Sequence, residues 1–221
     1  MKYIKKFHKK EIFGARNSKK SGKNFYLIEH LDKELGKWSL IEYENIGKKV
    51  GKKNLLFSNV NKVGDIRKLV KFGSVSPLPI YQLPFIKQKQ TKICVLDPCA
   101  PKLLTPKEAK KYDYFVFGGI LGDYPPRKRT QEELTSVMKK KGVKFEMRNI
   151  GKNQFSTDNA VFVVSEIVRG KDFNKMKFQD TFILKFGKFL QMELPYSYPL
   201  VGGKVLISKK LVSYLRKKKD F

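Results

Sequence analysis

The sequence predicts an α/β fold with a mainly parallel sheet, flanking helices and a small antiparallel part near the C-terminus. Up to about residue 175, short apolar runs alternate with stretches of helical periodicity, which is typical of a parallel sheet with crossover helices. Beyond Lys175 the apolar runs follow one another and are separated by turn residues such as Gly202 and Gly203, as in antiparallel hairpins. We therefore expect a basic flexible arm (1–24), an α/β core (25–175) and an antiparallel extension with a basic helix (176–221).

The first half of the core contains two predicted strands and two predicted helices. The strands are expected at residues 25–29 and 54–57, where apolar side chains run together. A helix is expected over residues 38–50, because its apolar residues recur on one face, and a shorter helix over 65–72. Residues 74–84 contain three closely spaced prolines, which predicts a loop.

The second half contains further strands in the same alternation. Strands are predicted at residues 92–96, 114–117 and 144–149, each ended by turn residues. Beyond the core, residues 182–186 and 189–193 are expected to be antiparallel strands.

Capping signals mark where the helices of this half begin and end. Thr105 and Glu108 form a capping box, in which each side chain bonds the backbone near the other residue. Thr130 with Glu133 predicts a second capped helix, which Gly142 ends. A third helix is expected after the Ser-Thr pair at 156–157, because the apolar residues there keep a helical period.

The charge of the chain favours a polyanionic partner. The sequence has 48 Lys and Arg against 20 Asp and Glu, a net charge of +28, whereas solubility alone needs about 2 to 8 in a small domain. Nine of the basic residues lie before residue 24, beside the single acid Glu11, and further Lys and Arg end the chain. We expect contact with RNA or with an RNA-bound protein, and extra electrostatic affinity from the arm.

Targeting and metal-binding signals are weak. No run approaches the roughly 18 apolar residues of a membrane span, and residues 1–23 lack the apolar core of a secretory signal, so a cytoplasmic protein is expected. Cys94 and Cys99 have too few Cys or His neighbours for a zinc site. They are expected to be free thiols in a reducing compartment.

Three loops follow the carboxyl ends of predicted parallel strands, where open α/β sheets bind ligands. They are LDP (96–98), GGILGD (118–123) and NIGKNQFSTD (149–158). The glycines of GGILGD let the backbone approach a flat heterocycle closely, which suits an adenosine group. Asp123 stands where a phosphate-binding P-loop needs Lys followed by Ser or Thr, so a triphosphate site is disfavoured. Taken alone, GGILGD is equally well explained as a structural turn that follows a strand.

Longer strings in the region from residue 25 to the C-terminus are more specific. They are FYLIEHLDKELGKWSLIEYENIGKKVGKKNLLFSNV, VLDP, YDYFVFGGILGDYPPRKRTQEEL and RNIGKNQFSTDNAVFV. Together they closely resemble a family of archaeal and eukaryotic SPOUT methyltransferases. Its archaeal members resemble RNA methyltransferases, and its eukaryotic branch resembles an arginine methyltransferase for a small-subunit ribosomal protein. The resemblance implies a trefoil-knotted α/β fold, an exception to the rule that chains avoid knots.

The resemblance also implies a cofactor and its pocket. The cofactor would be S-adenosylmethionine (SAM), bound bent in the knot, with no metal. By position, the pocket walls would include Leu96, Asp97, Pro98, Gly118, Gly119, Ile120, Gly122, Asn149, Ile150, Gly151, Phe155, Ser156 and Thr157. The reaction would be an in-line displacement at the sulfonium methyl group, which depends mainly on positioning two reactants and removing a proton.

Carboxylates in the matching strings help to choose between arginine and RNA. Arginine is protonated at every accessible pH, so its nitrogen needs a carboxylate to orient it and accept a proton. We assign Glu42 and Asp123 as catalytic candidates, with a structural role equally open for each. Glu29 is assigned as a substrate-binding candidate, although a structural role at the end of a strand beside His30 explains it better. Asp158 is better explained as a favourable charge at a helix start. His30 could act as a base, but no neighbouring pattern supports that role.

The predicted function is methylation of a ribosome-associated target, with a slight preference for an arginine of a small-subunit ribosomal protein. Arg127 and Arg129 are assigned to the substrate, because they could hold phosphate or an acidic segment, although they are also explained as ordinary loop charges. Methylation of a nucleotide in ribosomal or transfer RNA is the first alternative. A non-enzymatic RNA-binding assembly protein is the second. The chain is expected to be a monomer or a homodimer.

Overall fold

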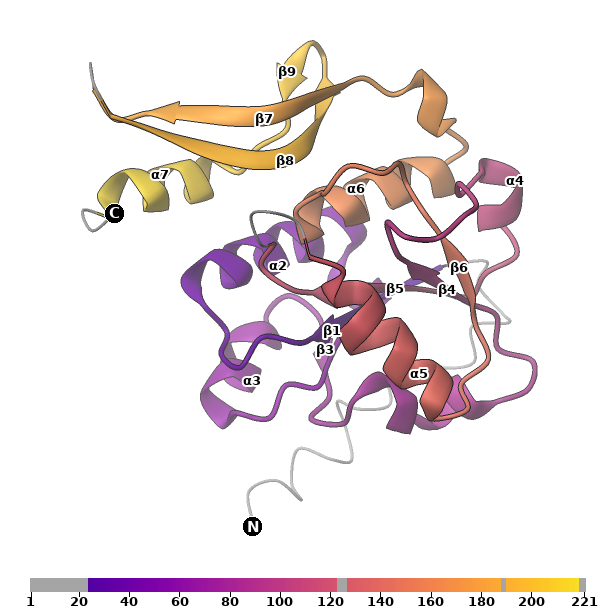
Figure 1. The fold of residues 1–221 in the computed structure, drawn as a ribbon. Coiled ribbons are helices and arrows are strands. Elements are labelled where there is room, and N and C mark those ends of the chain that lie inside the picture. The colour runs from indigo at the N-terminus through magenta and orange to yellow at the C-terminus, as the bar shows by residue number, and fades with distance from the viewer. Residues whose placement is uncertain (1–23, 123–126, 188–189, 219–221) are drawn as a thin grey trace.

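The computed structural model describes residues 24–122, 127–187 and 190–218, and these residues form two sheets with helices around them (Figure 1). The predicted basic arm lies almost entirely outside the described residues. The larger sheet has six strands and the smaller has three. Figure 1 shows the small sheet and the last helix stacked on one side of the larger α/β body.

The larger sheet is parallel throughout, in the order β3-β2-β1-β5-β4-β6. Its strands are β1 (Phe25–His30), β2 (Leu55–Ser58), β3 (Ser74–Val75), β4 (Ile93–Leu96), β5 (Tyr114–Gly119) and β6 (Glu146–Arg148). The predicted strands are confirmed with boundaries shifted by up to two residues. The exception is β3, a two-residue strand inside the segment that was predicted to be a loop.

Helices cover both faces of this sheet. They are α2 (Lys37–Val50), α3 (Val63–Leu69), α4 (Pro106–Ala109), the π-helical η5 (Thr130–Thr135), α5 (Ser136–Lys140) and α6 (Thr157–Val168), with short 3₁₀ turns η2 (Lys52–Asn54), η3 (Ile80–Gln82), η4 (Pro84–Lys87) and η6 (Phe173–Lys175). The predicted capping box is confirmed, since the Thr105 hydroxyl accepts a hydrogen bond from the Glu108 amide at 3.3 Å.

The start predicted for the helix at Thr130 is wrong. The helical segment already includes Thr130, and its first turns are a π-helix that continues into α5. Glu133 does not reach back to the backbone, because its carboxylate accepts the Arg129 guanidinium at 2.7 Å. The predicted end is confirmed, because Gly142 follows α5 with φ at +72°, a conformation that favours glycine.

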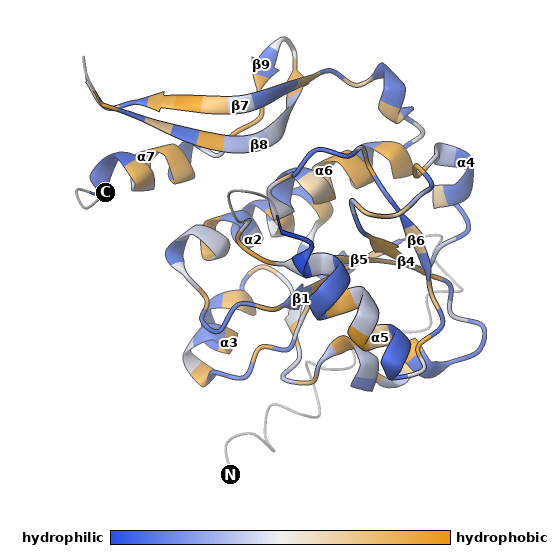
Figure 2. Cartoon of the chain, viewed as in Figure 1, coloured by the Kyte–Doolittle hydropathy of each residue, from blue (hydrophilic) through white to orange (hydrophobic). Residues whose placement is uncertain are grey.

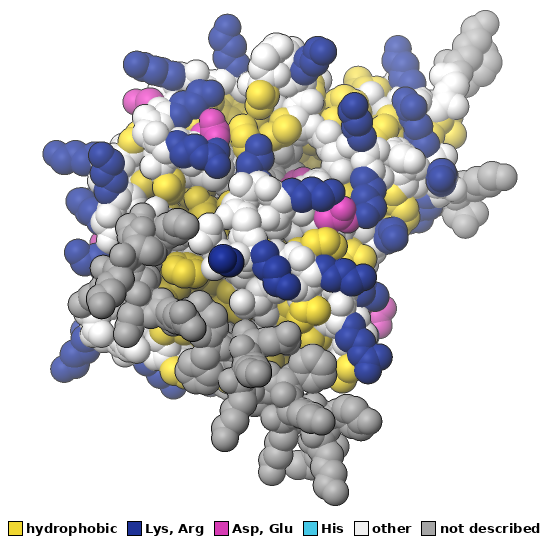
Figure 3. Space-filling model, turned by 180° about the vertical axis from the view of Figure 1, so that it is seen from behind, with side chains coloured by type: hydrophobic (Ala, Val, Ile, Leu, Met, Phe, Trp, Pro, Cys, Tyr) yellow, Lys and Arg dark blue, Asp and Glu magenta, His cyan; other side chains and the backbone are white. Residues whose placement is uncertain are grey.

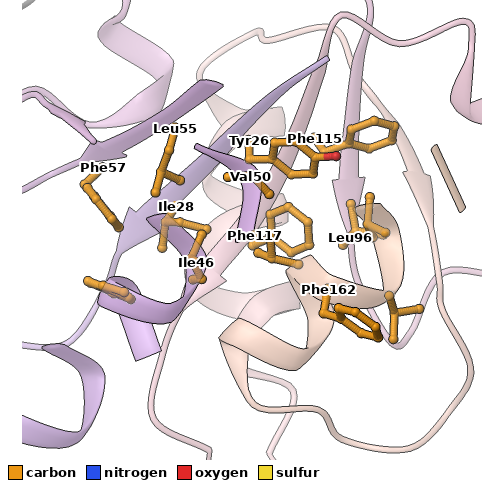
Figure 4. Packing of buried hydrophobic residues seen from close by; sticks show 14 of the residues in the cluster. Tyr26, Ile28, Ile46, Val50, Leu55, Phe57, Leu96, Phe115, Phe117 and Phe162 are labelled. Carbon is orange, nitrogen blue, oxygen red and sulfur yellow. The ribbon is translucent and has the colours of Figure 1, made fainter. Parts of the chain in front are cut away.

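Alternation along the strands produces a separate core on each face of the sheet. On one face Tyr26, Ile28 and Phe57 pack under α2 and α6, as Figure 4 shows for the labelled residues. On the other face Leu27 and Val116 pack against the helix formed by η5 and α5. Because both faces are buried, the strands carry nearly continuous apolar runs, and those runs made them visible in the sequence.

The antiparallel part predicted after Lys175 is confirmed. It consists of β7 (Phe178–Lys185), β8 (Gln191–Val201), β9 (Lys204–Val205) and α7 (Lys209–Lys217). Figure 2 shows apolar residues on α7 where it runs beside the hairpin. A third core joins Leu211 and Leu215 of α7 to Tyr198 of β8 and to Ile41 of α2. The last part of the chain is thereby fixed onto the helix that covers the larger sheet.

Two further predictions concern membranes and cysteines. In the described ranges no helix combines the length and the apolar character needed to cross a membrane. Cys94 and Cys99 are both free thiols, as predicted, with Cys94 buried in the sheet and Cys99 exposed.

Candidate active site

A cavity of about 550 Å³ lies at the carboxyl edge of the larger sheet, a size usual for small-molecule sites. The loops that follow β4, β5 and β6 all contribute to it, because parallel strands end at one edge of their sheet. Ten of the thirteen predicted wall residues line it: Leu96, Asp97, Pro98, Gly118, Ile120, Gly122, Ile150, Gly151, Phe155 and Thr157. Fold topology therefore brings the three loops together as the sequence predicted.

Gly119 does not line the cavity, although it was predicted to be part of its wall. It ends β5 and packs against β1 and α2 instead. A β-carbon at Gly119 would overlap the Tyr43 hydroxyl and would lie 2.8 Å from Ile28 and 3.0 Å from the Glu29 carbonyl oxygen. Glycine is required at this position by the core behind the cavity.

Asn149 and Ser156 also lie outside the cavity and support its loops. The Asn149 side chain donates to the Ala100 carbonyl at 2.7 Å and accepts from the Gly151 amide at 3.0 Å, so it ties the loop after β6 to the loop after β4. The Ser156 hydroxyl donates to the Asp158 carboxylate at 2.8 Å. Both residues hold the backbone that forms the wall.

The opposite wall of the cavity comes from the antiparallel part, which the sequence analysis did not assign to the site. Its residues are Asp180, Thr181, Pro195, Tyr196 and Ser197. The Ser197 amide donates to the Gln154 carbonyl at 2.8 Å, and the Tyr196 hydroxyl donates to the Gly122 carbonyl at 3.3 Å. These bonds join the β7–β8 hairpin to two of the cavity loops. No local motif in the sequence marks these residues.

Glu42 lies directly behind the cavity wall and is only 3% exposed. Its carboxylate accepts the Trp38 indole N–H at 2.7 Å and the Thr157 amide at 3.1 Å, and it also bonds the Thr157 hydroxyl. Burial, reinforced by the nearby Asp158 charge, raises the pKa of Glu42 to about 8. Thr157 is therefore the contact between this carboxyl group and the cavity.

Asp158 stands at the start of α6, as the structural explanation of this residue predicts. It accepts hydrogen bonds from Asn45 at 3.0 Å, from Ser156 at 2.8 Å and from the Asn159 amide at 3.0 Å. Burial raises the pKa of Asp158 above its usual range. Asp158 lines a second cavity, between α2 and α6, rather than the cavity at the sheet edge.

Glu29 and His30 lie in the core and do not reach the cavity. Glu29 accepts hydrogen bonds from the Ser58 hydroxyl and, at 3.0 Å, from the Ile80 amide. Burial raises the pKa of Glu29 to about 7. His30 pairs through Nδ1 with the Tyr43 hydroxyl at 3.0 Å, and burial lowers its pKa. The geometry of Glu29 suits a structural group better than the predicted substrate contact.

The raised pKa of the buried Glu29 carboxyl group predicts how the stability of the protein changes with pH. Its pKa is about 7 in the folded protein against 4.5 when free. Its contribution to the free energy of unfolding is therefore fully present below pH 4.5 and is lost as the pH rises through 7. The Gln side chain of Glu29→Gln cannot ionise, so the variant does not lose this contribution. Relative to the parent, its free energy of unfolding should increase by about 3 kcal/mol as the pH rises from 4.5 to above 7. Urea unfolding at pH 5 and pH 8 measures the gain, with Glu193→Gln, an exposed carboxylate on β8, as control. An equal difference at both pH values would contradict the prediction.

Arg127 and Arg129 both line the cavity, where the sequence placed them as substrate contacts. Arg129 binds Glu133 at 2.7 Å and Asp32 at 3.2 Å, and both carboxylates raise its pKa. Asp32 also accepts the Leu121 amide at 3.0 Å, so the cluster ties the loop after β5 to the loop after β1. Asp123, the second predicted catalytic acid, lies outside the described residues.

The described surface of the molecule is rich in basic side chains. Figure 3 shows Lys and Arg side chains spread over the back of the molecule with few carboxylates between them. Within the described ranges, no group of three or more His, Cys, Asp or Glu side chains is arranged to hold a metal ion.

Comparison with known proteins identifies the family. The model of the family described as protein arginine N-methyltransferase SFM1-like matches residues 25–220, nearly the whole chain after the basic arm. The chain belongs to this family. Protein arginine N-methyltransferase SFM1 of Saccharomyces cerevisiae is 33% identical over 204 residues, which cover 87% of this chain and 94% of the yeast protein.

Solved structures agree with this assignment. The crystal structure of the yeast arginine methyltransferase SFM1 complexed with SAM is 32% identical, covers 88% of this chain and 90% of its own, and has a TM-score of 0.78. The structure of a dual specific Trm10 from Thermococcus kodakaraensis is 18% identical over 69% of this chain and 96% of its own, with a TM-score of 0.55, and so supports the fold alone. The predicted SPOUT class is confirmed, and the chain is a methyltransferase of that class.

Proposed function

We propose that this protein transfers a methyl group from SAM to an arginine side chain of a ribosomal protein of the small subunit. The observation that carries the proposal is a cofactor-sized cavity with a buried carboxyl group, Glu42, directly behind its wall. The 33% identity to a yeast protein arginine methyltransferase supports arginine as the acceptor. The net charge of +28 supports a target that lies on RNA.

The cavity fits SAM in size and chemistry. Leu96, Ile120, Ile150 and Phe155 offer apolar surface for the adenine ring, and the backbone at Gly118 can approach it closely. SAM, SAH and MTA are the ligands named for three crystal structures of the yeast enzyme, at 30 to 32% identity. When bound, SAM supplies a methyl group on a positively charged sulfur.

The residues of this chain would then orient the acceptor and take up its proton. A guanidinium nitrogen becomes nucleophilic only as it loses a proton, so a nearby base lowers the barrier. Glu42 has a pKa of about 8, close to neutral pH, where a general base is most effective. The Thr157 hydroxyl, which bonds Glu42 and lines the cavity, would relay the proton. Asp123 remains a second candidate for orienting the acceptor.

An RNA nucleotide is the second candidate acceptor, and the basic surface is the observation that favours it. A ring nitrogen of a base can attack without help from a buried carboxylate, so Glu42 would then have no chemical role. The placement of Glu42 at Thr157 is the reason to prefer arginine.

Labelled SAM distinguishes the two acceptors. Ribosomes from cells that lack the enzyme are incubated with the protein and with SAM that carries a labelled methyl group, and protein and RNA are then separated. We expect the label in a small-subunit protein, as methylarginine after hydrolysis. Label in RNA alone would refute the proposal and favour the alternative.

A further inference from the structure

The antiparallel ladder between β7 and β8 is interrupted where it borders the cavity. Asp180 pairs with Ser197 and Phe182 pairs with Leu194, so Thr181 on one strand and Pro195 and Tyr196 on the other are left without ladder partners. Thr181, Pro195 and Tyr196, together with Asp180 and Ser197, line the cavity. The irregular part of the hairpin and the second wall of the cavity are therefore the same residues.

Thr181 has φ at +67°, which is rare for a β-branched residue and costs free energy. Such conformations persist where the surrounding structure imposes them, and they concentrate at functional sites. Asp180 lies directly beside this irregularity and lines the cavity, and its carboxylate accepts the Asn153 side chain at 2.9 Å. Asn153 belongs to the loop after β6, so Asp180 is fixed between the hairpin and the predicted cofactor loops.

The charges around the cavity distinguish Asp180 from the other groups. Asp97 also lines the cavity, but it is 2% exposed and its oxygens accept the Cys99 amide at 2.8 Å and the Thr135 hydroxyl at 3.3 Å. Asp180 is exposed, which makes it the accessible carboxylate among the described residues that line this cavity. Arg127, Lys128 and Lys152 line it as well and would repel a guanidinium group.

Building on the proposed function, we propose that Asp180 is the docking residue for the guanidinium group of the acceptor arginine. The three loops take the cofactor on one side, and the hairpin faces the acceptor on the other. Guanidinium groups bind carboxylates through directed, charge-assisted hydrogen bonds, so one accessible carboxylate on the acceptor side selects arginine. Asp180 thereby sets affinity for the acceptor, while Glu42 serves the transfer of the proton.

Asp180→Asn tests this role with little disturbance of the hairpin. The amide oxygen of Asn can still accept the hydrogen bond from Asn153, but the negative charge is gone. Initial rates are measured at saturating SAM, with total small-subunit proteins from cells that lack the enzyme as acceptor. We expect the half-saturating acceptor concentration to rise about tenfold, because a charge-assisted bond is lost, with the rate at saturation nearly unchanged.

Two further measurements separate docking from other roles. SAM affinity by calorimetry should equal that of the parent, and Glu193→Gln, an exposed carboxylate on β8 outside the cavity, should leave the half-saturating concentration unchanged. An unchanged value for Asp180→Asn, or a parallel loss of SAM affinity, would overturn the docking role while the proposed function stands. A parent enzyme that labels no protein would refute the proposed function and the docking role together.

Discussion

Glu42→Gln should lower the rate of methyl transfer by a factor of about 100 to 10,000, the usual cost of losing a general base. The amide keeps the shape of the side chain and can still accept a hydrogen bond from Trp38 or Thr157, but it cannot take up a proton. Since Glu42 does not line the cavity, SAM affinity should be retained. Single-turnover methyl transfer, measured beside SAM affinity by calorimetry, checks both parts of the prediction.

The pH profile separates a proton acceptor from a group that only holds the wall in place. Glu42 has a raised pKa of about 8, so the fraction able to accept a proton grows about tenfold per pH unit below pH 8. The parent rate should rise with that slope and level off above pH 8. Glu42→Gln should lose the slope as well as the rate. A variant that is slow but keeps the parent profile would show that Glu42 acts by position alone.

Two other substitutions complete the comparison. Glu44→Gln, two residues along α2, removes a partly buried surface carboxylate that pairs with Lys48 and Lys210 outside the cavity, and it should leave the rate unchanged. Asp123→Asn tests the second predicted acid in the same assay. If Glu42→Gln and Asp123→Asn both transferred methyl groups at the parent rate, the carboxylate mechanism would be wrong, and with it the preference for arginine over RNA.

Gly119→Val should destabilise the fold by about 3 kcal/mol or more, at or above the usual range for overpacking a core. The added side chain would meet the Tyr43 hydroxyl, Ile28 and the Glu29 carbonyl oxygen, and the backbone of β1 cannot move away without breaking its pairing with β5. Chemical denaturation measures the loss. Gly64→Val in α3 is the matched control, because nothing lies within 4 Å of a β-carbon at Gly64.

The structure assigns Gly119 a different role from the one that the sequence predicted. In the sequence analysis Gly119 was placed in the wall of the cofactor pocket, and from that position a branched side chain there would block the cofactor. In the structure, any loss of SAM binding by Gly119→Val would follow from damage to the core. A folded variant with the parent's free energy of unfolding would contradict the packing explanation.

Much of the fold could be predicted because both faces of the larger sheet are buried. Strands such as β4 and β5 must then be apolar throughout, and their runs are visible without any tertiary information. Thr105 with Glu108 marked α4 for a local reason, since a capping box is made within four residues. Thr130 and Glu133 have the same spacing, but Glu133 bonds Arg129. Capping patterns predict a helix start only when no stronger partner competes for the side chain.

The sequence by itself determined the three strand-end loops and hence one wall of the cavity, because parallel strands bring their carboxyl ends to one edge. It also determined the family, because long strings of residues are shared with it. Only the tertiary structure decided that Asp180 and Tyr196 form the other wall, that Glu29 belongs to the core, and that Glu42 stands behind Thr157. These placements depend on contacts between residues far apart in the chain, such as Glu42 and Thr157, and no local pattern records which buried side chains will meet.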